Sequence, residues 1–178
     1  MIPIDLLKKY YPEGSEVYHI MENHALSVTK KAQELAAKHP EYNMDLAFIE
    51  EAAMLHDIGC FLTNAPAIHC FGTNPYICHG YLGAEILRNE GFPRHALVAE
   101  RHTGSGLSYN HILKKGLPLP ARDMCPVSLE EKLICFSDKF FSKTKLDKEK
   151  SLSKVIENMH KHGSGSVKRF EDMCSLFL

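Results

Sequence analysis

Apolar residues recur at helical spacing along nearly the whole chain, and this periodicity limits the possible folds more than any other feature of the sequence. Between residues 15 and 39, for example, Val17, Ile20, Met21 and Val28 fall on one face of a helix. No convincing run alternates apolar and polar residues, as a half-buried strand would. The pattern therefore predicts an all-α protein.

Proline, glycine and capping residues divide this pattern into separate helices. Pro40 should end the second helix, because the residue before a proline is disfavoured in the α region, and Gly59 suits the end of the third. Ser128 and Glu131 have the spacing of an N-terminal capping box. We expect helices over residues 4–10, 15–39, 44–59, 80–89, 93–101, 108–115 and 128–143, with one or two more after residue 151. Residues 60–78, rich in Pro, Gly, Asn and Thr, should form a long loop, and such loops often carry function.

The length and charge of the chain limit its domain organisation and its partners. With 178 residues and no repeat or linker, it should form a single domain over residues 1–178, with a core at about 17–143 and C-terminal helices over 151–178 packed on it. The formal net charge is -1, so we expect neither nucleic acid nor an anionic membrane as a partner. No apolar run is long enough to span a bilayer. No feature of the sequence indicates an oligomeric state.

The cysteines and the N-terminus bear on the compartment. None of the six cysteines forms a C-x-x-C pair, and the first residues lack a basic region followed by a long apolar stretch. We therefore expect a cytoplasmic protein with reduced thiols, with disulfide bonding as the alternative.

Eleven histidines are present, and the position of His56 is the first that suggests a function. His56 continues the apolar helical face of Ile49 and Ala53, and Asp57 follows it directly. An imidazole and a carboxylate presented together at a helix end suit a first-row metal ion, and a carboxylate can bridge two such ions. Asp57 alone could instead be a hydrogen-bond acceptor at the end of the helix.

His24 and Asp138 also lie on the apolar faces of predicted helices, since each follows an apolar residue by four positions. A buried, unpaired aspartate is costly, so a cation should meet it. Taken alone, His24 could be a hydrogen-bonded core residue, and Asp138 could pair with Lys139 or Lys143. The coincidence on three separate helices favours a shared metal ion.

Two more histidines, His79 and His102, stand at the ends of predicted elements, where side chains can converge on a pocket. The alternatives are a capping or surface role for His79 and, for His102, a helix C-terminal position favoured by the helix dipole.

The order of these residues resembles the H…HD…D signature of the HD superfamily of metal-dependent phosphohydrolases. His24, then His56-Asp57, then Asp138 match that signature, and His56-Asp57-Ile58-Gly59 matches its common H-D-I-G form. His79-Gly80 and Arg101-His102-Thr103-Gly104 are similar to the two extra histidine motifs of the two-metal members. The resemblance covers roughly Val17 to Lys143.

The resemblance implies a helical bundle around a metal centre. His24, His56, Asp57 and Asp138 would hold a first divalent ion, and Asp57 would bridge to a second ion completed by His79 and His102. Iron, manganese, zinc, nickel, cobalt and magnesium all remain open. Asp57 would then be the catalytic residue, because two ions that share it hold a hydroxide in line with a phosphoester.

The chain also departs from particular HD proteins near Asp57. Cys60-Phe61 stand where hydrolases of guanosine tetraphosphate carry an acidic pair, and Cys60 also replaces a histidine of the mammalian cyclic-nucleotide phosphodiesterases. His102 is a single histidine where some two-metal relatives carry a pair. The missing acidic pair argues in particular against hydrolysis of guanosine tetraphosphate.

The expected function is therefore metal-dependent hydrolysis of a phosphomonoester, phosphodiester or phosphoanhydride in a nucleotide or another small phosphorylated metabolite. The candidates for binding substrate phosphate are Arg101, Thr103, Lys139 and Arg122, each of which could instead be an ordinary surface residue. Two other functions fit the same residues: a di-iron oxygenase of the HD type, and a non-catalytic HD module that binds a ligand. A complete set of six candidate ligands argues against the non-catalytic module.

Overall fold

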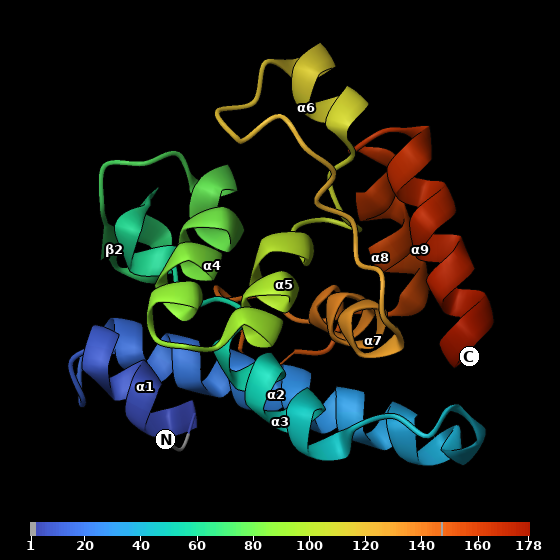
Figure 1. Ribbon diagram of the computed structural model, residues 1–178, viewed down its shortest axis with the longest axis horizontal. Coiled ribbons are helices and arrows are strands. Elements are labelled where there is room, and N and C mark those ends of the chain that lie inside the picture. The colour runs from blue at the N-terminus through green and yellow to red at the C-terminus, as the bar shows by residue number, and fades with distance from the viewer. Residues whose placement is uncertain (1–2, 147) are drawn as a thin grey trace.

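Most of the residues described by the computed structural model, which are 3–146 and 148–178, lie in nine α-helices (Figure 1). The predicted all-α fold is confirmed. The helices are α1 (Pro3–Tyr10), α2 (Glu16–Lys38), α3 (Leu46–Leu55), α4 (His79–Asn89), α5 (Pro93–Arg101), α6 (Tyr109–Lys115), α7 (Leu129–Asp138), α8 (Leu152–His160) and α9 (Ser164–Phe177). Among them, none is both long enough and apolar enough to cross a membrane.

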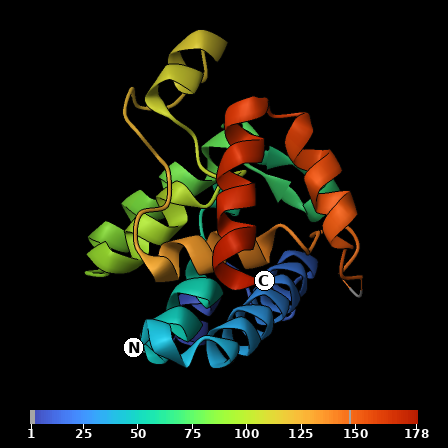
Figure 2. The same ribbon diagram turned by 90° about the vertical axis from the view of Figure 1, so that its right-hand side faces the viewer.

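The helices pack in pairs around the middle of the molecule. α2 packs along α3, and α7 contacts both of them. α4 and α5 form a second pair, and α5 connects this pair to α3 and α7. α9 packs on another side of α7 and α8 packs on α9, while α6 projects away from the other helices (Figures 1 and 2). The ends of α3, α5 and α7 and the start of α4 therefore meet near the centre.

Two apolar clusters flank this central region. One lies where α2, α3, α7, α8 and α9 meet, and in it the rings of Phe136 and Phe170 stack with their centroids 5.2 Å apart. The other joins α1 to α4 and α5 and contains the fully buried Tyr11. The Tyr11 hydroxyl donates a hydrogen bond to the carbonyl of Ile58 (3.0 Å), so the N-terminal segment holds the chain directly after α3.

Two predicted helices end earlier than expected. α3 ends at Leu55 rather than Gly59, and α7 ends at Asp138 rather than Lys143. After each end the backbone amides bond three residues back instead of four, as in the bond from the Ile58 amide to the Leu55 carbonyl (3.1 Å). These tighter turns leave His56, Asp57 and Asp138 at helix ends, where the side chains can leave the helix surface.

The predicted loop over residues 60–78 has more structure than expected. It contains the 3₁₀ turns η2 (Cys60–Leu62), η3 (Pro66–Ile68) and η4 (Tyr76–Cys78), and a fourth turn, η1 (Pro40–Tyr42), lies between α2 and α3. The same loop includes a two-stranded antiparallel sheet of β1 (Asn64–Ala65) and β2 (Cys70–Phe71). Nothing in the sequence indicated this small sheet, because strands of two residues are too short to show an alternating pattern.

Half of the predicted capping box forms. The Ser128 hydroxyl accepts a hydrogen bond from the Glu131 amide (3.1 Å), as the sequence predicted. The Glu131 carboxylate instead accepts from the Val127 amide (2.8 Å) and binds Arg101. Glu131 thus still caps α7, but one residue earlier than in the expected pattern.

Substitution of Gly59 is expected to destabilise the fold strongly. A Cβ atom at Gly59 would overlap the backbone of His79 and Gly83, so α4 would have to move away from the turn after α3. We expect Gly59→Ala to cost about 3 kcal/mol of unfolding free energy and to lower Tm by roughly 6–12 °C. Thermal unfolding followed by circular dichroism measures this. Gly165→Ala is the control, since its Cβ would meet only Nη1 of Arg169, at an ordinary contact distance of 3.4 Å. Equal Tm values for the two variants would contradict the close contact between Gly59 and the backbone of α4.

Candidate metal centre

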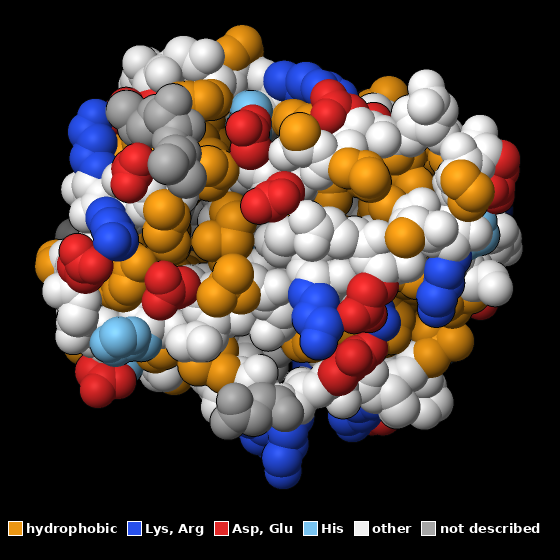
Figure 3. Space-filling view, turned by 90° about the horizontal axis from the view of Figure 1, so that it is seen from below, with side chains coloured by type: hydrophobic (Ala, Val, Ile, Leu, Met, Phe, Trp, Pro, Cys, Tyr) orange, Lys and Arg blue, Asp and Glu red, His pale blue; other side chains and the backbone are white. Residues whose placement is uncertain are grey.

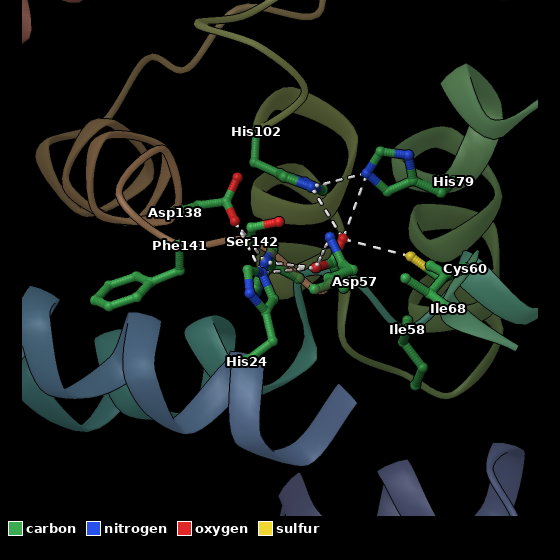
Figure 4. Close-up of polar contacts among 12 residues, drawn as sticks. His24, Asp57, Ile58, Cys60, Ile68, His79, His102, Asp138, Phe141 and Ser142 are labelled. Atoms are coloured by element: carbon green, nitrogen blue, oxygen red, sulfur yellow. Dashed lines mark hydrogen bonds and ion pairs between the residues drawn. The ribbon is translucent and has the colours of Figure 1, made fainter. Parts of the chain in front are cut away.

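Five different segments bring six side chains to the centre of the molecule. His24 comes from the middle of α2, His56 and Asp57 directly follow α3, and Asp138 is the last residue of α7. His79 begins α4, and His102 directly follows α5. All six are buried. Figure 4 shows five of them facing one another: His24, Asp57, His79, His102 and Asp138. The structure thus brings together every residue that the sequence proposed as a metal ligand.

These side chains form two donor groups that share one carboxylate. The first donor group is His24, His56, Asp57 and Asp138, and the second donor group is Asp57, His79 and His102. Within each group, one donor atom per residue lies within 4.8 Å of all the others.

The two oxygens of Asp57 face different groups. Its Oδ2 lies 2.9 Å from Nε2 of His56 and 3.2 Å from Nε2 of His24. Its Oδ1 lies 3.4 Å from Nε2 of His79 and 3.3 Å from Nε2 of His102. A carboxylate in this position can give one oxygen to each of two ions.

Three histidines have their donor nitrogens fixed by the backbone. Nδ1 of His56, His79 and His102 each bonds the carbonyl three residues earlier, at 2.6, 2.7 and 2.7 Å. A carbonyl oxygen can only accept a hydrogen bond, so each Nδ1 carries the proton. In the neutral rings Nε2 then has a free lone pair directed into the centre, which is the arrangement of metal-binding histidines.

Two contacts in the centre require a cation or a proton. Nε2 of His56 is buried and has no hydrogen-bond partner, although it lies 2.9 Å from Oδ2 of Asp57. Nε2 of His79 and Nε2 of His102 are 3.1 Å apart, and both are acceptors when their Nδ1 atoms carry the protons. Facing lone pairs repel each other, whereas imidazole and carboxylate donors together suit first-row divalent ions. The residues present therefore fit a metal centre.

The surroundings of these side chains favour ionised carboxylates at Asp57 and Asp138 and neutral imidazoles at His79 and His102. Burial opposes the charge on Asp57 and Asp138, but the nearby His56, Lys143 and Lys139 hold the pKa of each carboxyl well below its usual range. Burial lowers the pKa of His79 to about 3 and also lowers the pKa of His102. Neutral imidazoles and ionised carboxylates are the forms that bind metal.

His56 behaves differently when no metal is bound. Burial lowers its pKa, but the carboxylates of Asp57 and Asp138 outweigh burial and raise the pKa to about 9. In metal-free protein a proton on His56 thus takes the place of a cation between the imidazole and the carboxylates.

Metal-free protein should therefore lose stability as the pH rises from 6.5 to about 9. In this window the unfolded chain releases the His56 proton at its ordinary pKa of 6.5, while the folded protein keeps the proton up to about 9. The stabilisation is fully present below pH 6.5, and the total loss is on the order of 3 kcal/mol. Tm measured across this range after removal of metal with a chelator tests it.

Two comparisons control this experiment. Metal-loaded protein should show a much flatter Tm profile between pH 6.5 and 9, since a bound ion replaces the proton. His56→Gln should flatten the profile of the metal-free protein, because glutamine does not titrate. A metal-free wild-type profile as flat as that of His56→Gln would contradict the ion pairing.

Two lysines lie at the centre, and only Lys139 was proposed as a functional residue from the sequence. Nζ of Lys139, a predicted phosphate-binding residue, lies 2.6 Å from Oδ2 of Asp138 and donates to the His102 carbonyl (2.9 Å). Sequence analysis missed Lys143 as a functional residue, although its Nζ lies 2.6 Å from Oδ2 of Asp57. Its only signal was its position five residues after Asp138. The Cys60 thiol, also missed, donates to Oδ1 of Asp57 (3.6 Å).

The other proposed phosphate-binding residues do not join the centre. The Arg101 guanidinium binds both carboxylate oxygens of Glu131, at 2.9 and 3.1 Å. Arg122 binds Glu100. Thr103 lies beside Gly80: a Cβ atom added to Gly80 would be 3.0 Å from the Thr103 hydroxyl oxygen. The described contacts of both arginines are therefore with carboxylates outside the two donor groups.

The fold and the site together define a helical protein whose central side chains suit a metal centre with a shared carboxylate. The family model "HD domain" matches residues 21–143, and the chain belongs to this family. The resemblance inferred from the sequence motifs is thus confirmed.

Three relatives match most of the chain. An uncharacterized protein of Methanocaldococcus jannaschii is 35% identical over 149 residues, which are 82% of this chain and 80% of that protein. A tRNA (cytidine(56)-2'-O)-methyltransferase of Thermoplasma volcanium is 33% identical over 90% of this chain, and one of Picrophilus torridus is 30% identical over 88%. The matched regions are 40% and 44% of these two enzymes, so this chain spans less than half of their length.

Solved structures resemble the whole fold. The HD domain of the L. monocytogenes phosphodiesterase PgpH is 18% identical with a TM-score of 0.54, covering 96% of this chain and 94% of that one. The same domain in complex with cyclic-di-AMP has a TM-score of 0.56 at 17% identity, covering 97% and 94%. At these identities the likeness establishes the HD-domain fold.

Proposed function

We propose that this protein is a phosphohydrolase that uses two divalent metal ions. The observation that carries the proposal is the shared carboxylate, since Asp57 directs one oxygen at each donor group. When bound, two such ions supply hydroxide from coordinated water near neutral pH and neutralise charge on phosphoryl oxygens. The first donor group would hold one ion and the second donor group the other.

The residues beside the donor groups support binding of a phosphorylated substrate. A cavity of about 330 Å³, here named the Tyr76 cavity, adjoins His24 and is lined by Tyr76, Phe141, Lys143 and Lys150 together with small apolar side chains. The Lys143 ammonium lies between this cavity and Asp57, where it can bind an incoming phosphate. The aromatic and aliphatic walls suit the organic part of a nucleotide or a similar metabolite.

The structural neighbour supports this reaction class, whereas the names of the sequence relatives do not indicate a phosphohydrolase. The structural neighbour PgpH is a phosphodiesterase and was solved with cyclic-di-AMP. We propose that this chain acts on a small phosphorylated substrate, by cleaving a phosphomonoester, a phosphodiester or a phosphoanhydride.

Metal analysis followed by activity assays tests the proposal. Purified protein should contain close to two first-row divalent ions per chain. After loading with manganese, iron, cobalt, nickel, zinc or magnesium, it should release phosphate or a nucleotide from at least one member of a panel of phosphomonoesters, phosphodiesters and phosphoanhydrides. A chelator should stop the release, and the active metal should restore it.

The alternative functions give different results in the same experiments. Iron-loaded protein that consumes oxygen but releases no phosphate would contradict the proposal and favour a di-iron oxygenase. Metal-loaded protein that binds nucleotides without either reaction would favour a non-catalytic module. Release of phosphate that is unaffected by a chelator would contradict the metal-dependent mechanism.

A further inference from the structure

Three cavities follow one another past the candidate metal centre. The first is the Tyr76 cavity beside His24. The second, named the Asp138 cavity, has a volume of about 300 Å³ and shares Phe141 and Lys150 with the first. The third, named the α6 cavity, has a volume of about 570 Å³ and shares Gly104 and His162 with the second. The first two adjoin ligands of the first donor group, and the third extends away from it.

The residues that line the α6 cavity come mainly from α6, the chain just before it, and the turn that joins α8 to α9. Figures 1 and 2 show where these segments lie. The C-terminal helices that form one wall lie outside residues 21–143, which match the family model. Its cations are Lys114 and Lys115 from α6 and Arg169 from α9. Arg169 donates to the carbonyls of Ser105 (3.0 Å) and Gly106 (2.8 Å), so its guanidinium is held in place without a carboxylate partner among the described residues.

The charged side chains that line the three cavities are almost all basic. Among the residues described as lining them, Asp138 is the only carboxylate, and it belongs to the first donor group. Lys139, Lys150 and Lys161 line the Asp138 cavity. The whole chain has 21 lysines and arginines against 22 acidic residues, so this concentration does not follow from composition.

The opposite face of the molecule is different. The surface over α1, α2 and α3 carries acidic and basic side chains side by side (Figure 3). A basic cavity next to low-dielectric walls attracts anions, whereas a mixed surface does not. The cavities therefore form a continuous binding surface for anionic groups, which starts at the metal centre and leads toward α6.

The two sides of the centre favour different chemical groups. The Tyr76 cavity has aromatic and aliphatic walls formed by residues such as Ile68, Tyr76 and Phe141, which suit an organic group such as a base. The path through the Asp138 cavity to the α6 cavity is lined by lysines and Arg169, which suit phosphate. A phosphomonoester bound at the centre would reach only one of these sides.

We infer that the substrate has a second arm bearing phosphate, which extends from the scissile phosphate through the Asp138 cavity into the α6 cavity. This inference rests on the proposed hydrolase function and narrows the substrate class to an internal phosphodiester or phosphoanhydride. In the reaction, the oxygen of water bonds to the scissile phosphorus and the P–O bond to the second arm breaks. The attacking water loses a proton to solvent, and the released arm keeps the bridging oxygen, which takes up a proton from solvent.

A charge-matched pair of variants tests the α6 cavity. Lys114→Ala with Lys115→Ala, the α6 variant, removes two cations from the cavity. Lys30→Ala with Lys38→Ala, the control variant, removes two exposed lysines of α2. Both variants should keep wild-type metal content and circular dichroism, because neither pair lies in a donor group.

Two probes separate the second arm from the reaction itself. The short probe is the p-nitrophenyl ester of thymidine 5′-monophosphate, and the long probe is the linear dinucleotide pApA, which carries an additional phosphate. In the α6 variant, kcat/KM for pApA relative to the short probe should fall about tenfold, mainly through a higher KM, which corresponds to about 1.4 kcal/mol. The control variant should keep the wild-type ratio. An unchanged ratio in the α6 variant would overturn the inference while leaving the hydrolase proposal intact.

A binding measurement tests the cavity independently of activity. Inorganic tripolyphosphate should bind metal-free wild-type protein and the control variant with similar affinity in calorimetry, and about tenfold more weakly to the α6 variant. Loss of this binding in the α6 variant, with neither probe hydrolysed under any metal, would contradict the hydrolase proposal and support the anion site. Equal affinities in all three proteins would overturn the anion site.

Discussion

Asp57→Asn is expected to remove most of the bound metal and to reduce kcat by on the order of 10³-fold, with the helical fold retained. The amide has the size of the carboxylate but only one oxygen and no negative charge. It cannot direct an anionic oxygen at both His56 and His102, as Asp57 does. His56→Ala should have a similar effect, because it removes the donor closest to Oδ2 of Asp57 among the histidines.

Three measurements check this result: metal content by elemental analysis, circular dichroism, and steady-state kinetics on the best substrate of the panel. Asp172→Asn is the matched control, since Asp172 is an exposed residue of α9 paired with Lys168. This control should keep full metal content and activity. Wild-type metal content in both Asp57→Asn and His56→Ala would refute the assignment of the centre.

The residues of the candidate centre could be predicted because they interrupt apolar patterns. His24 and His56 each lie at a helical position where the neighbouring turns supply core residues, so their burial follows from periodicity alone. Asp138 follows the same rule on α7. Buried polar side chains need hydrogen-bond or ionic partners. Because three helices each place such a side chain on an apolar face, a single shared partner, such as a metal ion, is indicated.

The cations could not be predicted in the same way. Successive residues of a helix point about 100° apart, so a position next to a ligand in the sequence says little about direction. Arg101 precedes His102 yet binds Glu131 on α7. Lys143 reaches Asp57 because the chain leaves the helix after Asp138, and the sequence suggested a helix that continued to Lys143.

The irregular segment between α3 and α4 also depended on contacts that periodicity does not encode. The Asn74 side chain donates to the Leu62 carbonyl (2.9 Å), and the Asn64 amide donates to the Asn74 carbonyl (2.8 Å). Gly72 lies against the backbone of Leu62, where a Cβ atom would overlap it. These contacts join residues about ten positions apart, and they turn a predicted loop into 3₁₀ turns and a short β pair.

The double variant His79→Ala with His102→Ala is expected to retain close to one metal ion and to lose the second together with most activity. The first donor group provides four side chains without these histidines, which is enough to hold one ion with positions left for water and substrate. His79 and His102 have their Nδ1 protons fixed on backbone carbonyls and direct their Nε2 lone pairs toward Oδ1 of Asp57. They would therefore act as ligands of a second ion, with Asp57 as the third side chain of that group.

The alternative is a single-metal centre in which His79 and His102 bind substrate or transfer protons. The alternative predicts one ion in the fully loaded wild-type protein and the same content in the double variant. The histidines would then affect the pH profile of kcat rather than the metal stoichiometry. Substitution of His95, which pairs with Glu51 away from the donor groups, by alanine controls for the loss of a histidine. Two ions in the wild type and in His95→Ala, against one in the double variant, would show that His79 and His102 hold a second ion and would contradict the single-metal alternative.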